Sequence, residues 1–436
     1  MTDRPSGYAE KLTTAREAVK CVKSGDTVYV GSTSSLAYKL CEALTAREDG
    51  LENVTLTCSQ FRRSSPAFNN ADNGRFSFKS FFLGTGERYG LSQGFGDFTS
   101  VHLSQVDIWC RETARPDVAF IEVSPCDENG YMSFGATGVA VDRCICDIAE
   151  TVILQVNRNA PYVYGEDNLI HFSEADYIVE ADDALETVQE IPADETIRTI
   201  SQSIVELIPD GATIQLGIGG VASAVGYGLA QKNDLGIHSE LMSDVLMNLM
   251  KSGVVTNKAK TYFPNVSVAG FSFGSEELYH FLDRNEEVYF QPFSKVNDPV
   301  NIAKNNNMIS INTAMSVDLF GQVSSESLGF RQYSGTGGQL DFVRGAQMSK
   351  GGKSFIALPS TVKTKTNGIK SRIVLSFAPG TVVTTPRSDV QYVATEYGCV
   401  NLKPLGMKDR VRAMISLAHP DFRDQLRDEA KQYGIV

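Results

Sequence analysis

This 436-residue sequence lacks the features that mark nucleic-acid-binding, secreted and membrane-spanning proteins. Its 40 basic residues are outnumbered by 52 acidic ones, and a net charge of −12 argues against non-specific binding to nucleic acid, which needs a basic surface. The N-terminus, Met1 to Pro5, has no basic start leading into an apolar run, so we expect no signal peptide. No stretch is apolar for long enough to cross a bilayer. These absences predict a soluble, cytoplasmic protein.

The cysteine spacing that would indicate a metal site is also missing. Eight cysteines lie mostly in apolar segments, at positions 21, 41, 58, 110, 126, 144, 146 and 399. Cys144 and Cys146 form the only close pair, and a pair with neither a second pair nor a nearby histidine is a poor metal site. We therefore expect buried, reduced thiols and no bound metal.

The chain reads as two copies of one unit. A helix, a glycine turn and a strand occupy residues 15–31, and the same order recurs over residues 201–217 with the glycines at one constant offset. A second pair of similar stretches, Asp127 to Ser133 and Asp318 to Ser324, follows in the same order. Two pairs of similar stretches in the same order, at nearly the same offset, are unlikely to arise by chance. The sequence therefore predicts an internal duplication.

Helices alternate with short strands rich in valine and isoleucine, which is typical of parallel sheets covered by helices. The predicted fold is therefore α/β, with two tandem, duplicated units and mainly parallel sheets. The acidic, proline-containing segment from Ala181 to Glu195 has no apolar period and reads as a junction, which gives domains 1–185 and 196–436. Ligands of such duplicated proteins often bind between the units, so we expect an inter-domain active-site cleft.

Two glycine loops in the second copy suit acyl chemistry. Gly217-Ile218-Gly219-Gly220 follows an expected strand, and Ser334-Gly335-Thr336-Gly337-Gly338-Gln339 comes about a hundred residues later. Glycines at such junctions let backbone N–H groups point at a negatively charged oxygen. A carboxylate beside those donors, such as Glu240, could attack an acyl group while the amides hold the developing oxyanion.

Glu240 has three interpretations. It could be a solvated glutamate at a helix start. It could hold a ribose hydroxyl, because an acid about 20 residues after a Gly-x-Gly turn is typical of dinucleotide sites. It could also be a nucleophile, which needs no base to activate it if its pKa is the ordinary value of about 4.3. The residue pattern alone leaves all three open.

Longer motifs resemble a known family. They include Gly217-Ile-Gly-Gly220, Leu235-Gly-Ile-His-Ser-Glu-Leu-Met-Ser-Asp244, Gly335-Thr-Gly-Gly-Gln-Leu-Asp-Phe342 and Thr395-Glu-Tyr-Gly398. In this order the motifs resemble the family I-like CoA-transferases, the acetyl-CoA hydrolase/transferase group, and they are most similar to its 4-hydroxybutyrate and butyryl-CoA:acetate branch. The resemblance runs nearly end to end.

The resemblance implies that Glu240 is a covalent nucleophile. It would attack an acyl-CoA to give a mixed anhydride and a CoA thiolate, and the thiolate would return to form a glutamyl-CoA thioester in ping-pong kinetics. The implied oxyanion donors are the backbone N–H groups of Ile218 and Gly338, and one such donor is typically worth about 3 kcal/mol. Asn297 would contact the thioester region, although a turn residue before Pro299 is the alternative.

The resemblance also implies that CoA is a substrate and that no cofactor is permanently bound. Gly217, Gly219, Gly220, Gly335 and Gly337, together with Gln339, are the residues expected near CoA, since glycines let a ligand approach the backbone closely. Residues 350–372 contain six basic residues and no acid. We assign Lys363, Lys365 and Arg372 of this stretch to the nucleotide end of CoA, with a solvated lysine-rich loop as the alternative.

Other polar residues receive structural roles. We expect His238 to orient or pack, His419 to cap or pack the C-terminal helices, and Asp244 and Asp341 to be structural. The family frequently has an arginine where Tyr162 follows Pro161, and this region is expected to recognise the acyl or carboxylate end. The family also suggests a homodimer or a larger homo-oligomer.

The predicted function is transfer of CoA between a short-chain acyl-CoA and a free carboxylate such as acetate, butyrate or 4-hydroxybutyrate. An acyl-CoA hydrolase differs only in using water as the acceptor. An NAD-dependent oxidoreductase would leave the second glycine loop unexplained. A non-enzymatic CoA-binding subunit would tolerate the loss of Glu240.

Overall fold

The computed structural model describes residues 5–63, 65, 74–189, 192–364 and 368–435. Contacts between Cα atoms divide the chain into two compact units. The first comprises residues 1–189, 242–244 and 268–296, and the second comprises residues 190–241, 245–267 and 297–436. Unlike the predicted domains 1–185 and 196–436, these units are not continuous stretches of chain.

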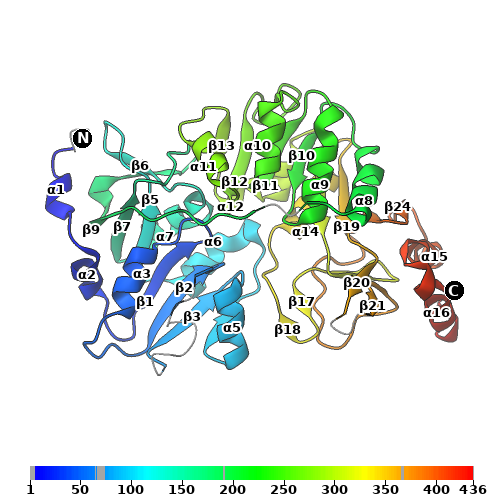
Figure 1. The fold of residues 1–436 in the computed structure, drawn as a ribbon, viewed down its shortest axis with the longest axis horizontal. Coiled ribbons are helices and arrows are strands. Elements are labelled where there is room, and N and C mark those ends of the chain that lie inside the picture. The colour runs from blue at the N-terminus through cyan, green and yellow to red at the C-terminus, as the bar shows by residue number, and fades with distance from the viewer. Residues whose placement is uncertain (1–4, 64, 66–73, 190–191, 365–367, 436) are drawn as a thin grey trace. The chain divides into compact units, whose positions relative to one another are not determined.

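The first unit is built on a seven-stranded parallel sheet with the order β4-β3-β2-β1-β5-β7-β9 (Figure 1). Its strands are β1 (Thr27–Ser32), β2 (Val54–Ser59), β3 (Phe76–Ser80), β4 (Gly96–Phe98), β5 (Val118–Val123), β7 (Thr151–Asn157) and β9 (Tyr177–Ala181). A short antiparallel pair, β6 (Tyr131–Ser133) and β8 (Leu169–His171), stands apart. Also in this unit are β12 (Ser267–Ser272), of which all but the first residue belongs here, and β13 (Val288–Phe290).

Helices accompany this sheet, and its central strands β1, β5 and β7 are almost fully buried. The helices of the first unit are α1 (Tyr8–Lys11), α2 (Ala15–Ala18), α3 (Tyr38–Thr45), α5 (Thr85–Gln93), α6 (Val106–Trp109), α7 (Asp142–Ile148), α11 (Glu276–Leu282) and α12 (Phe293–Val296). All six residues of β5 are buried, as expected for a parallel strand covered on both faces. One apolar cluster joins Val28 and Val30 of β1 with Leu40 of α3 and Phe120 of β5.

In the second unit, six strands are hydrogen-bonded in the order β11-β10-β14-β19-β23-β24. They are β10 (Thr213–Leu216), β11 (Gly236–Met242), β14 (Met308–Thr313), β19 (Lys353–Ala357), β23 (Tyr392–Thr395) and β24 (Gly398–Asn401). All neighbouring pairs among them are parallel except β23 and β24. The prediction of an α/β fold with mainly parallel sheets is therefore confirmed.

Short strands and helices complete the second unit. The short strands are β15 (Ser316–Asp318), β16 (Val323–Ser324), β17 (Ser327–Leu328), β18 (Arg331–Gln332), β20 (Thr361–Lys363), β21 (Ile369–Ser371) and β22 (Ile373–Val374). The helices are α8 (Glu195–Val205), α9 (Gly220–Gly228), α10 (Asp244–Lys251), α13 (Pro299–Ala303), α14 (Gln339–Met348), α15 (Met407–Leu417) and α16 (Pro420–Gln432). An apolar cluster joins Val343 of α14, Ile356 of β19 and Met414 of α15.

The predicted duplication is confirmed in strand order and in one turn. In the first sheet, β1 lies between β2 and β5, and β5 is followed by β7 and β9. In the second, β10 lies in the same way between β11 and β14, and β14 is followed by β19 and β23. In the first unit, Asp127 Oδ1 accepts hydrogen bonds from the N–H groups two and four residues later, and Asp318 Oδ1 does the same in the second. Each turn contains a glycine with a positive φ, 85° at Gly130 and 84° at Gly321.

Strand register also identifies the position that corresponds to Glu240 in the first unit. Val28 of β1 is paired with Leu56, and Ile214 of β10 is paired with Ile237. Three residues further along these second strands stand Ser59 and Glu240, respectively. The sequence alone revealed no such counterpart. The two copies therefore differ at this position, with a hydroxyl in one and a carboxylate in the other.

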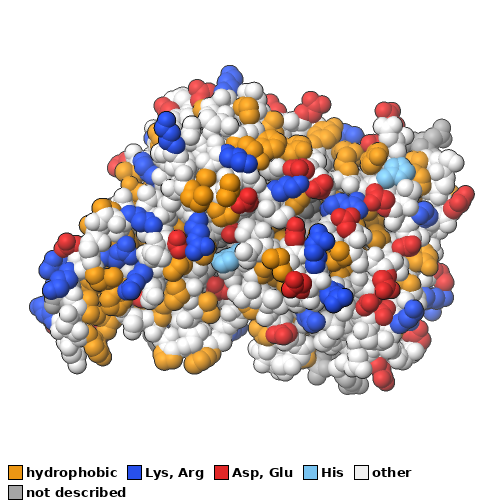
Figure 2. All heavy atoms as spheres, turned by 180° about the vertical axis from the view of Figure 1, so that it is seen from behind, with side chains coloured by type: hydrophobic (Ala, Val, Ile, Leu, Met, Phe, Trp, Pro, Cys, Tyr) orange, Lys and Arg blue, Asp and Glu red, His pale blue; other side chains and the backbone are white. Residues whose placement is uncertain are grey.

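The surface agrees with the mixed charge of the sequence. On the face drawn in Figure 2, lysine and arginine side chains are interspersed with aspartate and glutamate side chains and do not gather in one basic patch. Among the helices that the structure describes, none is both long enough and apolar enough to cross a bilayer.

Candidate active site

Glu240 lies on β11, near the carboxyl end of the strand and next to β10. Its side chain is partly accessible, whereas His238, Ser239 and Leu241 around it are buried. Asn297 donates a hydrogen bond from Nδ2 to Glu240 Oε2 over 2.8 Å. The backbone N–H of Gly338 also donates to this carboxylate. Three of the four residues predicted to be catalytic are therefore in contact with one another.

Two short helices place the donors. Asn297 lies just before α13, where Asp298 provides the N-cap by accepting from the Val300 N–H over 3.0 Å. Gly338 is the N-cap residue of α14, and α13 packs against α14. Because Asp298 provides the cap of α13, the Asn297 side chain is not needed for capping and can donate to Glu240. The alternative interpretation of Asn297 as a turn residue does not account for this contact.

Space around the carboxylate requires glycine at position 338. A Cβ atom at Gly338 would lie 2.0 Å from Glu240 Oε2 and 2.1 Å from Asn297 Nδ2. Its φ of −98° is open to any residue, so the constraint is close approach and not backbone strain. Only a residue without a side chain lets this backbone N–H reach the carboxylate.

Burial raises the pKa of Glu240 to about 7. The hydrogen bonds from Asn297 and Gly338 oppose this rise, whereas the nearby charge of Asp341 adds to it. The sequence had suggested an ordinary carboxyl pKa. Loss of hydration explains the difference, because it disfavours the charged form of an acid. In the resting protein, both protonation states of Glu240 are populated near neutral pH.

The first glycine loop joins β10 to α9. Gly219 has a φ of 126°, which favours glycine, and α9 begins at Gly220. The Gly217 N–H donates to the Ile311 carbonyl over 2.8 Å, so it continues the sheet. The Ile218 carbonyl accepts from Thr313 Oγ1 over 3.2 Å, and the Ile218 side chain is 53 % exposed. The loop therefore follows the carboxyl end of β10, beside the strand that bears Glu240.

The second glycine loop is held by Glu326, a buried residue that sequence reasoning missed. Its Oε2 accepts from Thr336 Oγ1 over 3.2 Å and from Gln332 Nε2 over 3.0 Å. Its backbone carbonyl accepts from the N–H groups of Tyr333 and Ser334. These bonds fix the segment that leads through Gly335 and Gly337 to Gly338. Nothing in the local sequence distinguishes Glu326 from a surface glutamate.

Gln339 is bound by the protein itself. Its Nε2 donates to the Thr313 carbonyl over 2.9 Å, and its Oε1 accepts from the hydroxyls of Ser325 and Thr385. Because its amide has partners at both ends, the side chain anchors the start of α14. Its predicted contact with CoA remains a prediction.

The basic stretch of residues 350–372 is divided by β19. Lys353 begins that strand and donates from Nζ to the Leu207 carbonyl, and Lys350 precedes it, at the amino end of the strand. Lys363 and Arg372 lie at the hairpin of β20 and β21, beyond the carboxyl end. Ligands of open α/β sheets bind outside the carboxyl ends of the strands, so this hairpin is better placed for CoA than Lys350 and Lys353. Lys365 lies outside the described residues.

The remaining polar residues have structural partners. His238 is buried, with Nδ1 3.2 Å from Asn305 Nδ2 and its ring packed near Tyr262 and Phe342, which agrees with a packing role. His419 caps α16 by accepting from the Asp421 N–H.

The two aspartates differ from each other. Asp244, in the first unit, accepts from the Ser275 N–H over 3.0 Å, as expected of a structural residue. Asp341, which was expected to be structural, acts on the pKa of Glu240 through its charge. Its electrostatic role could not be predicted, because it depends on where the first turn of α14 lies relative to β11.

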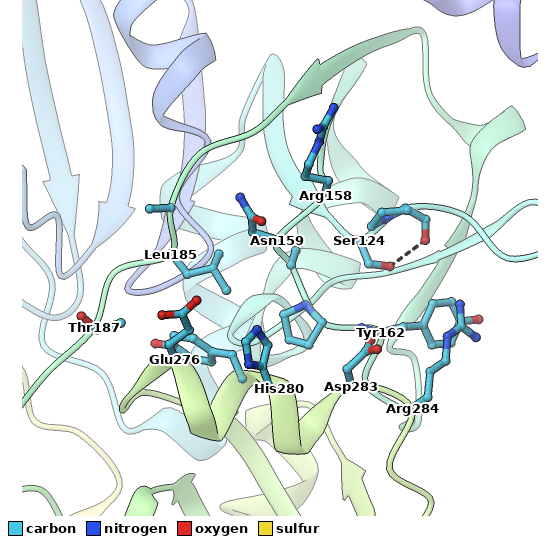
Figure 3. A pocket seen from close by; sticks show the side chains of 15 residues that line it. Ser124, Arg158, Asn159, Tyr162, Leu185, Thr187, Glu276, His280, Asp283 and Arg284 are labelled. Atoms are coloured by element: carbon cyan, nitrogen blue, oxygen red, sulfur yellow. Dashed lines mark hydrogen bonds between the residues drawn. The ribbon is translucent and has the colours of Figure 1, made fainter. Parts of the chain in front are cut away.

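A cavity of about 780 Å³ lies within the first unit (Figure 3). It includes Pro161 and Tyr162, the region expected to recognise the acyl or carboxylate end. The Arg284 guanidinium lies 4.6 Å from the centre of the Tyr162 ring, and the Tyr162 hydroxyl donates to Asp127 Oδ2 over 3.0 Å. A cation from a different segment of the first unit therefore lies over the Tyr162 ring.

Comparison with known proteins identifies the family of this chain. The acetyl-CoA hydrolase/transferase N-terminal domain matches residues 1–190, and the C-terminal domain of the same family matches residues 274–430. A 4-hydroxybutyrate coenzyme A transferase from Clostridium kluyveri is 40 % identical over 426 residues, which cover 98 % of each chain. A butyryl-CoA:acetate CoA-transferase from Anaerostipes caccae is 37 % identical, covering 98 % of this chain and 97 % of its own.

A solved structure is similar over nearly the whole chain. The crystal structure of RipA from Yersinia pestis superposes with a TM-score of 0.92 at 36 % identity, covering 98 % of this chain and 99 % of that one. With CoA-transferases as relatives over nearly its full length, the protein is an enzyme of the CoA-transferase class. The chain belongs to the acetyl-CoA hydrolase/transferase family.

Proposed function

We propose that this protein transfers CoA between a short-chain acyl-CoA and a free carboxylate through a thioester on Glu240. The observation that supports the proposal most strongly is the partly accessible Glu240 carboxylate, held by Asn297 Nδ2 and the Gly338 N–H. A carboxylate that is fixed by two donors, with no cation among the described residues that act on its pKa, suits nucleophilic attack. The relatives named above are CoA-transferases of short-chain acids, which suggests acetate, butyrate or 4-hydroxybutyrate as substrates.

The first half-reaction would have two steps. A Glu240 oxygen attacks the thioester carbon, the C–S bond breaks, and a mixed anhydride and a CoA thiolate are formed. The thiolate then attacks the Glu240 carbonyl carbon, the anhydride C–O bond breaks, and the free acid leaves as a carboxylate. The product is a glutamyl-CoA thioester. A second carboxylate reverses these steps, which requires ping-pong kinetics.

The donors that hold Glu240 suit the second of these steps. When the thiolate attacks the Glu240 carbon, the oxyanion develops on an oxygen of Glu240 itself. Asn297 Nδ2 and the Gly338 N–H already donate to this carboxylate in the resting state. Donors that are in place before charge develops cost no reorganisation, and one of them is typically worth about 3 kcal/mol. The first intermediate develops on the acyl oxygen, for which the Ile218 N–H remains the proposed donor.

The contacts with CoA and the assembly belong to the same proposal. We assign the pantetheine chain to the two glycine loops and the nucleotide end to Lys363, Lys365 and Arg372. A cytoplasmic location and a homodimer or larger homo-oligomer are proposed with them. The protein would hold CoA only as a substrate.

Hydrolysis of acyl-CoA is the second candidate, and it uses the same nucleophile with water as the acceptor. The test is to follow the loss of acetyl-CoA with and without butyrate, and to measure butyryl-CoA. Transfer predicts that acetyl-CoA is consumed only when butyrate is present, with one butyryl-CoA formed for each acetyl-CoA lost. Consumption at the same rate without butyrate, and with free CoA as the product, would contradict it.

A further inference from the structure

Two cysteine thiols of the first unit are in contact, far from Glu240 in the sequence. Cys110 begins the π-helical turn Cys110–Ala114 that continues α6, and Cys144 lies on α7. This turn and α7 pack against each other. The two thiols hydrogen-bond to one another, and all eight cysteines are free. The CoA-transferase chemistry assigns no role to this pair.

The two thiols differ in accessibility. Cys110 is buried, whereas Cys144 is partly exposed. Cys144 also lines a cavity of about 120 Å³, together with Arg111, Arg143 and Lys295. Such a volume holds several water molecules, so a hydroperoxide of similar size can enter. Cys144 therefore lies at a small polar cavity and interacts with a second, buried thiol.

The hydrogen bond also separates the thiols in acidity. It lowers the pKa of Cys144, and the charge of Arg111 acts in the same direction, while burial, Asp107 and Asp147 oppose them. The same bond and burial raise the pKa of Cys110. The thiolate is the nucleophile in thiol chemistry, so Cys144 is the member of the pair that reacts first.

Five other cysteines differ from Cys144 in the direction of their pKa shift. Burial is the main cause that raises the pKa of Cys21, Cys41, Cys58, Cys146 and Cys399. Cys146 lies on the same helix as Cys144 but is buried. The distinction therefore comes from the neighbouring thiol and the cavity and not from α7 as such.

We propose that Cys144 and Cys110 are a site of reversible oxidation, at which a hydroperoxide converts the two thiols into a disulfide. The Cys144 thiolate attacks one peroxide oxygen, so that an S–O bond forms, the O–O bond breaks, and the second oxygen leaves as water or an alcohol after taking a proton. Cys110 Sγ then attacks Cys144 Sγ, the S–S bond forms, and the S–O bond breaks with release of water. The two thiols supply the two electrons that reduce the peroxide. A dithiol reductant returns both thiols.

The test is to treat the full-length protein with about one equivalent of hydrogen peroxide, alkylate the remaining thiols, and digest it without reductant. The expected result is one disulfide-linked peptide pair that joins Cys110 to Cys144, about 2 Da lighter than the two thiol peptides, and restored by dithiothreitol. The Cys146→Ser variant, altered two residues away on the same helix, is expected to form the same link. In Cys110→Ala treated with at least two equivalents of hydrogen peroxide, Cys144 is expected to proceed through sulfenic acid to sulfinic acid, because no second thiol is present to attack the sulfenic acid.

Three outcomes would overturn the proposal. They are alkylation of both thiols after peroxide treatment, a link from Cys144 to a different cysteine, and sulfinic acid at Cys144 while Cys110 is present. The wild-type measurement needs no variant to fold, so misfolding of Cys110→Ala would not obscure the answer.

Discussion

At the scale of residues, the surroundings of Glu240 act on its pKa in opposite directions. Burial favours its neutral form, whereas attack on a thioester needs the carboxylate. Asn297 and Gly338 favour the charged form and Asp341 disfavours it, so three neighbours adjust the pKa around a value of about 7. In the proposed role of nucleophile, Glu240 would be more basic than an ordinary glutamate and still available in its charged form at neutral pH.

The first prediction concerns the pH dependence of the first half-reaction. In the wild-type protein, the single-turnover rate with acyl-CoA should rise with pH and level off above about 7, since Glu240 must lose its proton. Asn297→Ala removes a donor to the carboxylate, so its inflection should move to higher pH. Asp341→Asn removes a neighbouring negative charge, so its inflection should move to lower pH. Shifts of both variants in the same direction would contradict this electrostatic account.

The second prediction concerns stability. The folded pKa of Glu240 is raised above its ordinary 4.5 to about 7, so its stabilising contribution is fully present below pH 4.5 and is lost as the pH rises through 7. Glu240→Gln cannot ionise. The unfolding free energy of Glu240→Gln minus that of the wild type should therefore increase from pH 5 to pH 8, by at most about 3 kcal/mol. Urea unfolding of both proteins at the two pH values measures this increase. A difference in unfolding free energy that is the same at pH 5 and at pH 8 would refute the prediction.

The third prediction concerns Gly338. In Gly338→Ala, the added methyl would displace the Glu240 carboxylate and Asn297 Nδ2, and we expect kcat to fall by about 100-fold to 1,000-fold, as on loss of an oxyanion donor. Gly406→Ala is the matched control, because no heavy atom lies within 4 Å of the added Cβ and its φ is −64°. Steady-state kinetics of both variants make the comparison. Equal activity of the two would show that the close approach is unimportant.

At the scale of elements, the second glycine loop depends on a contact across the chain. Thr336 Oγ1 donates to the buried Glu326 carboxylate, and the loop leads directly to Gly338. A hydrogen bond to a charged group contributes about 1.5–3 kcal/mol. Its loss should therefore loosen the segment that positions the Gly338 N–H.

The fourth prediction tests this contact. Thr336→Val keeps the shape of the side chain but removes the hydroxyl, and we expect kcat/KM for acyl-CoA to fall by about 10-fold or more. Thr336→Ser retains the hydroxyl and should stay within about 2-fold of the wild type. If Thr336→Val matches Thr336→Ser in kcat and in KM, the loop does not need Glu326.

The elements also show what the sequence could reveal. Gly25 and Gly211 could be aligned from the sequence alone, because each ends a helix and starts the same strand of a repeated unit. The repeated turns at Asp127 and Asp318 could be found for the same reason, since each pattern is local. Glu240, Asn297 and Gly338 were predicted through resemblance to a family, and their mutual contacts are in the structure.

What could not be predicted arises from contacts between distant segments. The anchoring of Gln339 by Thr313 and Thr385 depends on how α14 meets two other segments. Lys353 looked equivalent to Lys363 in a basic stretch, but β19 separates them by its own length. The raised pKa of Glu240 depends on burial, which no local pattern shows.

At the scale of the whole molecule, the two duplicated units differ in chemistry. The position of Glu240 in the second unit corresponds to Ser59 in the first, so only one copy presents a carboxylate at the end of this strand. A hydroxyl cannot form the anhydride and thioester of the mechanism that we propose. One covalent intermediate per chain is therefore expected.

That intermediate provides the most direct measurement. The protein is incubated with acyl-CoA without an acceptor acid, treated with borohydride, digested, and the modified peptide is located by mass spectrometry. The account predicts a single reduced site, at Glu240, in the wild type and none in Glu240→Ala, which should still bind CoA but have lost nearly all turnover. Modification at a different residue, or full turnover by Glu240→Ala, would contradict it.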